Sequence, residues 1–191
     1  MIIALVLTIV SMIDYIYNAR EIFMTKENPT EDLASQVIKL ANEKGVTIGT
    51  AESLTGGLVA SKLTSVSGSS KVYAGSVVSY MYKVKEKLLG IDPVHLKNYG
   101  AVNETTAVGM ATGAVEKLNC DLCVSTTGIA GPDKDEFDTP VGEVFIGFAN
   151  KKDAKAKRYK FKGSRKEIRE ACVEKALSVF IILLKDLPNK D

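Results

Sequence analysis

The chain has 191 residues, 46% hydrophobic and 25% charged, with a formal net charge of +2, which predicts one compact domain of ordinary globular composition. Because the basic residues are dispersed apart from 151–160, the sequence argues against a broad electropositive surface for nucleic acid. The three cysteines are an odd number without a second cluster of Cys or His, so we expect reduced thiols in a cytoplasmic protein, and no metal site.

Residues 1–28 differ in character from the rest of the chain. The run from Met1 to Ile13 is almost wholly apolar, but Asp14 ends it at a length too short to cross a ~30 Å hydrocarbon core as a helix. It also lacks the preceding basic residue and the clean cleavage site of a signal peptide. Two interpretations remain: an extension upstream of a natural start near Met24, and an interfacial amphipathic segment. We therefore place the domain at 29–187 and expect no membrane association.

From residue 30 onward, segments with helical and strand patterns alternate. Apolar residues at helical spacing predict helices at 30–44, 84–89, 103–118 and 164–185, and the segment 53–65 predicts a glycine-opened turn followed by a helix. Stretches rich in β-branched and aromatic residues predict strands at 46–51, 71–80, 120–126, 142–149 and 157–162. The polar, Pro-terminated segment 133–140 is typical of a surface loop. This alternation, closed by a hairpin, predicts an α/β fold: a three-layer α/β/α sandwich with a mixed central sheet.

Two glycine-bearing loops, 51–57 and 127–132, each follow a predicted strand. Ligands gather at the carboxyl ends of strands in an open α/β sheet, and a helix amino terminus there offers backbone N–H groups to a phosphate or an oxyanion. Neither loop has the spacing of a Walker A motif or a dinucleotide fingerprint. The two loops are therefore candidates to line one site, although glycines after strands also simply form turns.

Ser53 lies at the first of these strand-to-helix turns, and a serine hydroxyl needs a base to take its proton before it becomes a good nucleophile. The single histidine, His95, is more typical of a surface or packing residue. Lys85 is the alternative base, because desolvation lowers a lysine pKa toward neutrality. Tyr80 ends the preceding strand, where its phenol is placed to relay a proton or orient the amine. On spacing alone, Lys85 is one lysine among many.

Six segments occur in a recognisable order along the chain. They are AESLTGG at 51–57, SGSSKVYAGSVVSY at 67–80, Lys85 with LLGI at 88–91, YGAVNE at 99–104, TGIAGP at 127–132 and PVGEVFIGFA at 140–149. In these motifs the chain resembles the CinA carboxy-terminal domain family, whose stand-alone members are the PncC-type nicotinamide-mononucleotide deamidases. The resemblance runs from about Pro29 to Leu184. The molybdopterin-binding-like domain of full-length CinA proteins does not occur in this sequence, so we expect the short form.

The resemblance implies an α/β/α amidohydrolase that converts nicotinamide mononucleotide to nicotinate mononucleotide and ammonia, in pyridine-nucleotide salvage, without metal or cofactor. It assigns the nucleophile to Ser53, the general base to Lys85 and an active-site tyrosine to Tyr80. It assigns phosphate binding to Arg165, whose guanidinium suits such a group. The two loops would supply the other substrate-binding residues: Thr55, Gly56, Gly57, Gly128, Ile129, Ala130 and Gly131. Backbone N–H groups near Thr55 and Gly56 would hold the oxyanion. The expected partner is the nucleotide substrate, and a homo-oligomer remains open.

The chain departs from the usual family pattern at four positions. The family commonly has a cysteine or another small residue at Leu54, asparagine at Tyr82, lysine at Thr139 and aspartate at Ser164. Tyr82 and Thr139 matter most, because altered polar groups in a pocket change substrate preference or weaken turnover. The main rival interpretation is therefore a catalytically weakened nucleotide-binding or regulatory CinA-like protein. A third interpretation, a membrane-tethered interaction protein, rests only on residues 1–28.

Overall fold

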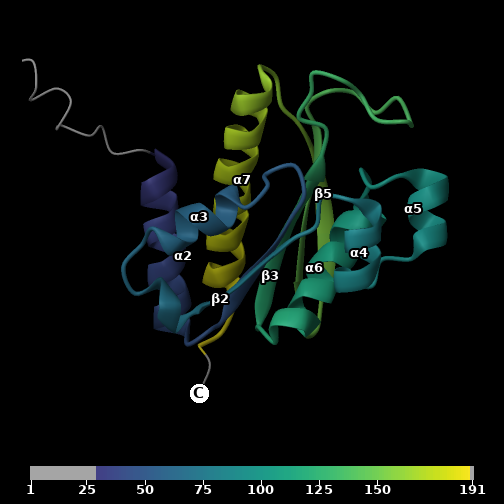
Figure 1. Ribbon diagram of the computed structural model, residues 1–191. Helices are drawn as coiled ribbons and strands as arrows, with labels where there is room; N and C mark the ends of the chain where they lie inside the picture. Colours follow the sequence, from purple (N-terminus) through teal and green to yellow (C-terminus); the bar gives the residue numbers. More distant parts are fainter. Residues whose placement is uncertain (1–28, 190–191) are drawn as a thin grey trace, which may run out of the picture.

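A five-stranded sheet lies between two layers of helices in the computed structural model, which describes residues 29–189 (Figure 1). The strands are β1 (Ile48–Glu52), β2 (Tyr73–Val78), β3 (Leu122–Gly128), β4 (Glu143–Asn150) and β5 (Ala154–Lys160). Their order is β2-β1-β3-β4-β5; β1 is parallel to β2 and β3, whereas β4 is antiparallel to β3 and β5. The predicted mixed sheet and three-layer sandwich are confirmed. The expectations for residues 1–28 lie outside the described residues.

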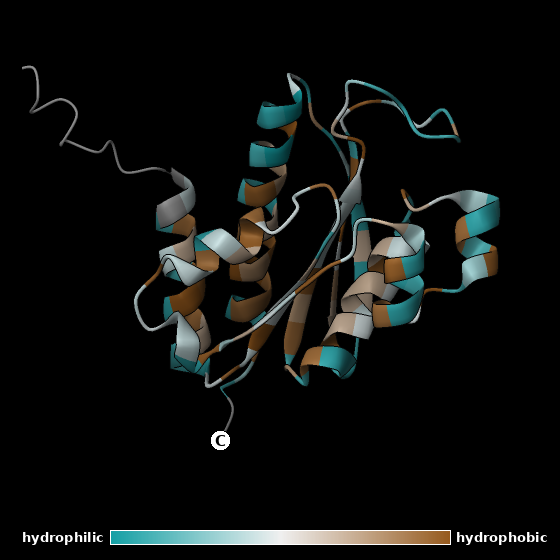
Figure 2. Ribbon diagram, viewed as in Figure 1, coloured by the Kyte–Doolittle hydropathy of each residue, from teal (hydrophilic) through white to brown (hydrophobic). Residues whose placement is uncertain are grey.

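Helices cover both faces of this sheet. The helices α2 (Pro29–Lys44), α3 (Leu58–Thr64) and α7 (Arg165–Asp186) pack on one face, and α4 (Tyr82–Leu89), α5 (Pro93–Tyr99) and α6 (Glu104–Leu118) lie on the other (Figure 1). Figure 2 shows hydrophobic residues on the strands and on the sides of the helices that face them. Each face has its own apolar core, with Phe180 fully buried in one and Met110 in the other. Each such side chain stabilises the fold by about 1.5–3 kcal/mol.

The element boundaries differ from the predictions where the polar site is built. The segment 53–65 forms the expected glycine-opened turn and helix, and the helix begins at Leu58, because Gly56 and Gly57 have positive φ angles of 59° and 92° and form the turn. The predicted strand 120–126 runs from Leu122 to Gly128, and the predicted helix 84–89 begins at Tyr82. The sequence analysis missed α5, although Asp92 caps it by accepting from Val94 N and Pro93 occupies its first turn.

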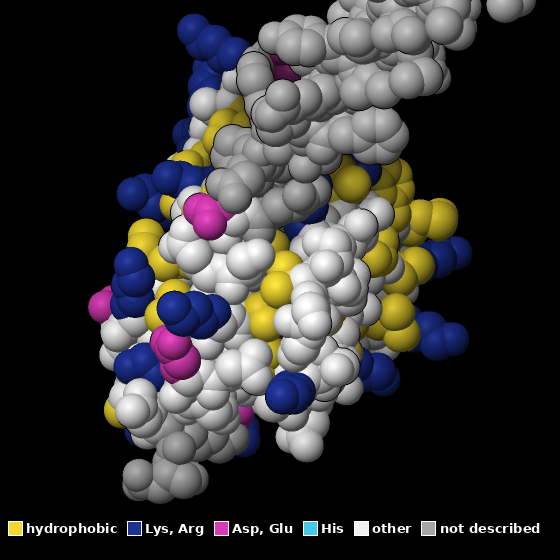
Figure 3. Space-filling view, turned by 90° about the vertical axis from the view of Figure 1, so that its left-hand side faces the viewer, with side chains coloured by type: hydrophobic (Ala, Val, Ile, Leu, Met, Phe, Trp, Pro, Cys, Tyr) yellow, Lys and Arg dark blue, Asp and Glu magenta, His cyan; other side chains and the backbone are white. Residues whose placement is uncertain are grey.

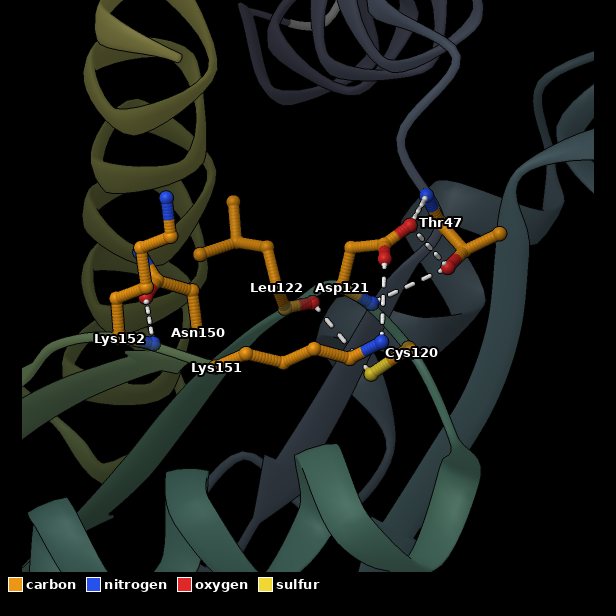
Figure 4. Close-up of polar contacts among 7 residues, drawn as sticks. All are labelled: Thr47, Cys120, Asp121, Leu122, Asn150, Lys151 and Lys152. Carbon is orange, nitrogen blue, oxygen red and sulfur yellow. Dashed lines mark hydrogen bonds and ion pairs between the residues drawn. The ribbon is translucent and has the colours of Figure 1, made fainter. Parts of the chain in front are cut away.

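A polar cluster lies at the amino ends of β1 and β3; we call Thr47, Asp121 and Lys151 the Thr47–Asp121 cluster (Figure 4). The Asp121 carboxylate accepts from Thr47 N at 2.9 Å and from Thr47 Oγ1 at 2.8 Å. The Asp121 N–H donates back to Thr47 Oγ1 at 3.1 Å, and Lys151 Nζ lies 3.9 Å from Asp121 Oδ1. These reciprocal bonds join the segments that enter two neighbouring parallel strands.

The surface charge, the cysteines and the apolar character of the helices each bear on an expectation from the sequence. On the face formed by α2 and α3, lysine and arginine side chains stand apart from one another among hydrophobic and polar groups (Figure 3). Cys120, Cys123 and Cys172 are free and buried. Within the part of the chain that the structure describes, no helix is both long and apolar enough to span a membrane.

Candidate active site

Ser53 follows the last residue of β1 and opens the turn that leads into α3. Its backbone N–H donates to Thr126 O of the neighbouring strand β3 at 2.9 Å, which holds the residue at the carboxyl end of the sheet. The side chain is 9% exposed and lines a cavity of about 290 Å³. Ser53 is therefore held by the sheet while its hydroxyl remains reachable from the cavity.

Lys85 projects from α4 toward this hydroxyl. Lys85 Nζ lies 3.0 Å from Ser53 Oγ and donates to the carbonyl oxygens of Ser79 at 2.6 Å and Tyr80 at 3.4 Å. The residue is only 1% exposed. The backbone at the end of β2 therefore fixes the amine beside the serine.

Burial changes the acidity of this amine. Burial lowers the pKa of Lys85 from 10.5 to about 8, because the charged ammonium loses hydration that the interior does not replace. No carboxylate among residues 29–189 forms an ion pair with Lys85 that would reverse this effect. With a pKa near 8, roughly a tenth of the molecules carry a neutral amine at pH 7.

The cavity brings together the ends of β1 and β3, the start of α4, the loop 133–140 and the first residue of α7. Its lining residues are Ser53, Leu54, Tyr80, Tyr82, Lys85, Ala101, Val102, Thr127, Gly128, Ile129, Ala130, Asp135, Glu136 and Arg165. The two predicted loops thus meet at one end of the sheet. His95 is elsewhere: it lies on α5, where its Nε2 bonds Asn103 Oδ1 at 3.1 Å.

Arg165 and Tyr80 form a pair at the cavity wall. The Arg165 guanidinium donates to Gly131 O at 2.6 Å and to Tyr80 Oη at 3.0 Å. The expectation that the Tyr80 phenol orients the Lys85 amine is wrong for this conformation, because the phenol bonds Arg165 and only the Tyr80 carbonyl contacts the amine. Tyr80 is 61% exposed, so its ring lies at the mouth of the site.

Four residues predicted to bind substrate, Thr55, Gly56, Gly57 and Gly131, do not line the cavity. Gly56 N donates to Ser53 O at 3.1 Å, and Thr55 Oγ1 bonds Thr126 Oγ1 at 2.8 Å. The Gly57 N–H donates to the Glu52 carboxylate at 2.9 Å. The expected oxyanion donor near Gly56 is therefore wrong for this conformation, because that N–H closes the turn.

The sequence analysis missed the residue that organises this turn, Glu52. This carboxylate is fully buried and accepts from three backbone N–H groups, those of Gly57 at 2.9 Å, Val59 at 3.2 Å and Ala60 at 2.8 Å. These are donors of the α3 amino terminus that were expected to be free for a phosphate. A carboxylate just ahead of a glycine-opened helix is the signal that could have indicated this capping role.

Arg169, also missed, holds the same turn from α7. Its Nε donates to Leu54 O at 2.9 Å, and one terminal nitrogen donates to Thr55 O at 2.8 Å. A planar guanidinium suits this two-point contact. The backbone that follows Ser53 is therefore held both from β3 and from α7.

The family model of the CinA C-terminal domain matches residues 30–184. The chain belongs to this family. A CinA-like protein of Salinibacter ruber is 45% identical over 134 residues, which cover 70% of this chain and 32% of that protein. A CinA-like protein of Geobacter sulfurreducens is 40% identical over 157 residues, covering 82% of this chain and 38% of that protein.

Solved structures agree with this assignment. The crystal structure of a competence/damage inducible protein from Agrobacterium tumefaciens has a TM-score of 0.79 and 35% identity, covering 83% of this chain and 97% of that chain. A CinA superfamily protein from Klebsiella pneumoniae has a TM-score of 0.80 and 26% identity, covering 83% of this chain and 99% of that chain. The CinA domain described here spans only 32% to 40% of the length of the curated relatives that it matches.

Two of the four positions expected to differ from the family pattern, Tyr82 and Thr139, form hydrogen bonds with acidic residues of the loop 133–140, to which Thr139 itself belongs. Tyr82 Oη donates to Glu136 Oε1 at 2.6 Å. Burial is the larger cause of a raised pKa for Tyr82, and this hydrogen bond is the next. The Thr139 hydroxyl donates to Asp135 Oδ2 at 2.9 Å, and the Thr139 N–H donates to Asp135 Oδ1 at 2.9 Å. Tyr82 and Thr139 are thus linked through one acidic loop, whose Asp135 and Glu136 line the cavity.

Proposed function

We propose that this CinA domain, residues 29–187, hydrolyses the carboxamide of nicotinamide mononucleotide to nicotinate mononucleotide and ammonia. The observation that carries the proposal is the 3.0 Å contact between Lys85 Nζ and Ser53 Oγ, with the lysine 1% exposed. A buried amine beside a serine hydroxyl at the carboxyl end of a sheet is an arrangement for nucleophilic catalysis. The substrate class is carried over from the resemblance described in the sequence analysis, and the proposed reaction is a step of cytoplasmic nucleotide salvage.

The hydrogen bonds of Lys85 suit a general base. A neutral amine has two N–H donors and one lone pair. The carbonyls of Ser79 and Tyr80 accept from Nζ, which accounts for both donors and leaves the lone pair for the Ser53 hydroxyl. The group that must lose its proton therefore lies within the reach required for general-base catalysis, about 2.6–3.2 Å.

The chemistry is an acyl transfer in two halves. Ser53 gives its proton to Lys85 as its oxygen bonds the amide carbon, and the Lys85 ammonium then returns that proton to the nitrogen that leaves as ammonia. Lys85 next takes a proton from the water that attacks the acyl ester, and it returns this proton to Ser53 Oγ as the ester bond breaks. The carboxylic acid so formed then ionises to the carboxylate. The Leu54 N–H follows the nucleophile, and its residue lines the cavity. We assign the oxyanion to this donor in place of Gly56.

Arg165 is our candidate for the substrate phosphate. Two donors of its guanidinium hold Gly131 O and Tyr80 Oη, and the remaining three of the five are left for a ligand. Tyr80 then acts as a positioning residue for Arg165. The cavity of about 290 Å³ lies near the lower end of the range for small-molecule sites, about 300–1,000 Å³.

Ammonia release from nicotinamide mononucleotide by purified wild type, beside Ser53→Ala, tests the proposal. Ser178→Ala, on the exposed side of α7, is the matched control for loss of a serine hydroxyl. We expect wild type and Ser178→Ala to release ammonia and Ser53→Ala to lose turnover by about 10²-fold or more. Nucleotide binding without ammonia release by wild type would instead support the non-catalytic regulatory interpretation. The observation that favours this alternative is the Tyr82–Glu136 hydrogen bond at the cavity wall, which involves a position expected to differ from the family pattern.

A further inference from the structure

The cavity carries side chains of both charge signs. Lys85 and Arg165 line it on the basic side, and Asp135 and Glu136 of the loop 133–140 line it on the acidic side. The acyl-transfer chemistry uses neither carboxylate. Their presence beside a serine–lysine pair therefore calls for a separate explanation.

The two carboxylates differ in how far the protein already satisfies them. Asp135 Oδ1 accepts from the N–H groups of Phe137 and Thr139, and Oδ2 accepts from the Thr139 hydroxyl. Asp135 thus holds the loop in shape. Glu136 accepts one hydrogen bond, from Tyr82 Oη to Oε1, and its Oε2 accepts none from any residue that the structure describes.

Tyr82 gives this carboxylate a fixed position. The phenol extends from the first residue of α4, three residues before Lys85, and its 2.6 Å bond joins two segments that are 54 residues apart in the chain. A tyrosine phenol is protonated over the whole neutral range, and burial raises the pKa of Tyr82 further, so the phenol can donate to the carboxylate throughout that range. A charge that is fixed before binding costs little ordering when a ligand arrives.

We propose that Glu136, positioned by Tyr82, is a specificity-determining residue that favours carboxamide nucleotides whose ring carries a positive charge. The inference rests on the proposed function and refines its substrate class. Nicotinamide attached to ribose through its ring nitrogen is a pyridinium cation, and the same molecule ends in a phosphate anion. A cavity with Glu136 and Arg165 in its wall matches both charges. A nucleotide with a reduced, neutral dihydropyridine ring gains nothing from Glu136.

Binding to a protein that cannot turn the ligand over isolates this effect. Calorimetry on Ser53→Ala and on Ser53→Ala/Glu136→Gln compares two ligands, nicotinamide mononucleotide and its reduced form. Glutamine keeps an acceptor for the Tyr82 hydroxyl and removes only the charge. We expect the double variant to bind the pyridinium ligand about 5- to 10-fold more weakly, the size of one charge–charge contact in a partly solvated site. The reduced ligand should bind within about 2-fold of its original affinity.

Two further variants separate charge from loop structure. Asp138→Asn alters a carboxylate of the same loop that bonds Lys134 and does not line the cavity, and it should change neither affinity. Tyr82→Phe removes the hydroxyl that holds Glu136, so the preference for the pyridinium ligand should fall part of the way toward that of Glu136→Gln. A variant that only loosened the loop would weaken both ligands alike.

The proposal is overturned if Glu136→Gln weakens both ligands equally, if it weakens neither, or if nicotinamide mononucleotide does not bind Ser53→Ala at all. Failure of the proposed function is a different result. Wild type that released no ammonia, yet whose preference for the pyridinium ligand depended on Glu136, would contradict the hydrolase and keep the specificity residue.

Discussion

The two ends of the paired strands β1 and β3 carry polar groups that are used in opposite ways. At the amino ends, Thr47 and Asp121 bond each other reciprocally (Figure 4). At the carboxyl ends, Lys85 is buried with two carbonyls and the hydroxyl of Ser53, and it forms no ion pair with any carboxylate that the structure describes. A matched polar pair stabilises a fold, whereas an unmatched buried amine costs stability and keeps a lone pair for chemistry.

Substitution of Lys85 should have the largest effect on turnover. Lys85→Met keeps the length of the side chain and removes the base, so we expect ammonia release from nicotinamide mononucleotide to fall by about 10²-fold or more. Lys83→Met, an exposed lysine of the same helix, is the control and should keep the wild-type rate. Equal rates for wild type and Lys85→Met would leave Ser53 without a base and refute the dyad.

Lys85→Met should also be more stable than wild type, because it removes a buried amine that lowers the stability of the fold. The folded-state pKa of Lys85 lies below its usual value of 10.5. The stability cost is therefore complete below about pH 8 and disappears as the pH rises through 10.5. At pH 7 we expect Lys85→Met to raise the free energy of unfolding by on the order of 1–3 kcal/mol, measured by urea denaturation. The difference should shrink as the pH rises from about 8 to 10.5.

The pH dependence of wild type should show the same group. The neutral form of Lys85 is the active one, so kcat/KM should rise with pH and level off above a pKa of about 8. Below that value the rate should fall about tenfold per pH unit, because each unit reduces the neutral amine tenfold. A profile that stays flat from pH 6 to pH 9 would contradict Lys85 as the base.

Arg165 should affect binding more than chemistry. Arg165→Ala removes the proposed phosphate contact, and we expect KM for the nucleotide to rise about tenfold with a smaller change in kcat. The measurement is the same ammonia assay over a range of substrate concentrations. Lys166→Ala, at the next and exposed position of α7, is the control. An unchanged KM for Arg165→Ala would remove the phosphate assignment.

The opposite end of the sheet should show the smallest effect on activity. Asp121→Ala leaves the Thr47 N–H and hydroxyl without their acceptor, so we expect the free energy of unfolding to fall by about 1–3 kcal/mol. Ammonia release should stay at the wild-type rate. Lys151→Ala removes only a 3.9 Å surface ion pair and should change stability by about 0–1 kcal/mol. A loss of activity in folded Asp121→Ala would contradict the conclusion that the amino ends of β1 and β3 serve stability and not catalysis.

Local patterns were enough to predict the sheet, its helical layers and the meeting of the loops that follow β1 and β3. Apolar spacing and the positions of glycines are local signals, and they carry this information directly. The base could not be identified from local patterns, because spacing alone does not distinguish Lys85 from the other lysines. The resemblance to the CinA family singled it out.

Contacts between distant parts of the chain could not be predicted. Arg169 and Leu54 are 115 residues apart, and Tyr82 and Glu136 are 54 apart, so no local pattern joins either pair. The wrong assignment of Gly56 and Gly57 has a related cause. A free helix amino terminus and one occupied by a buried carboxylate have the same glycine pattern, and only the position of the Glu52 side chain distinguishes them.

Gly113 on α6 lies against the carboxyl end of α4, so closely that a methyl group on it would collide with the Leu89 carbonyl. The helix α4 also carries Lys85, one turn earlier in its sequence. The two backbones are therefore closely packed, and this packing helps to place the helix from which Lys85 reaches toward Ser53. The alignment of Lys85 with Ser53 thus depends in part on a glycine outside the cavity. A larger residue at position 113 would push α4, and the base that it carries, away from α6.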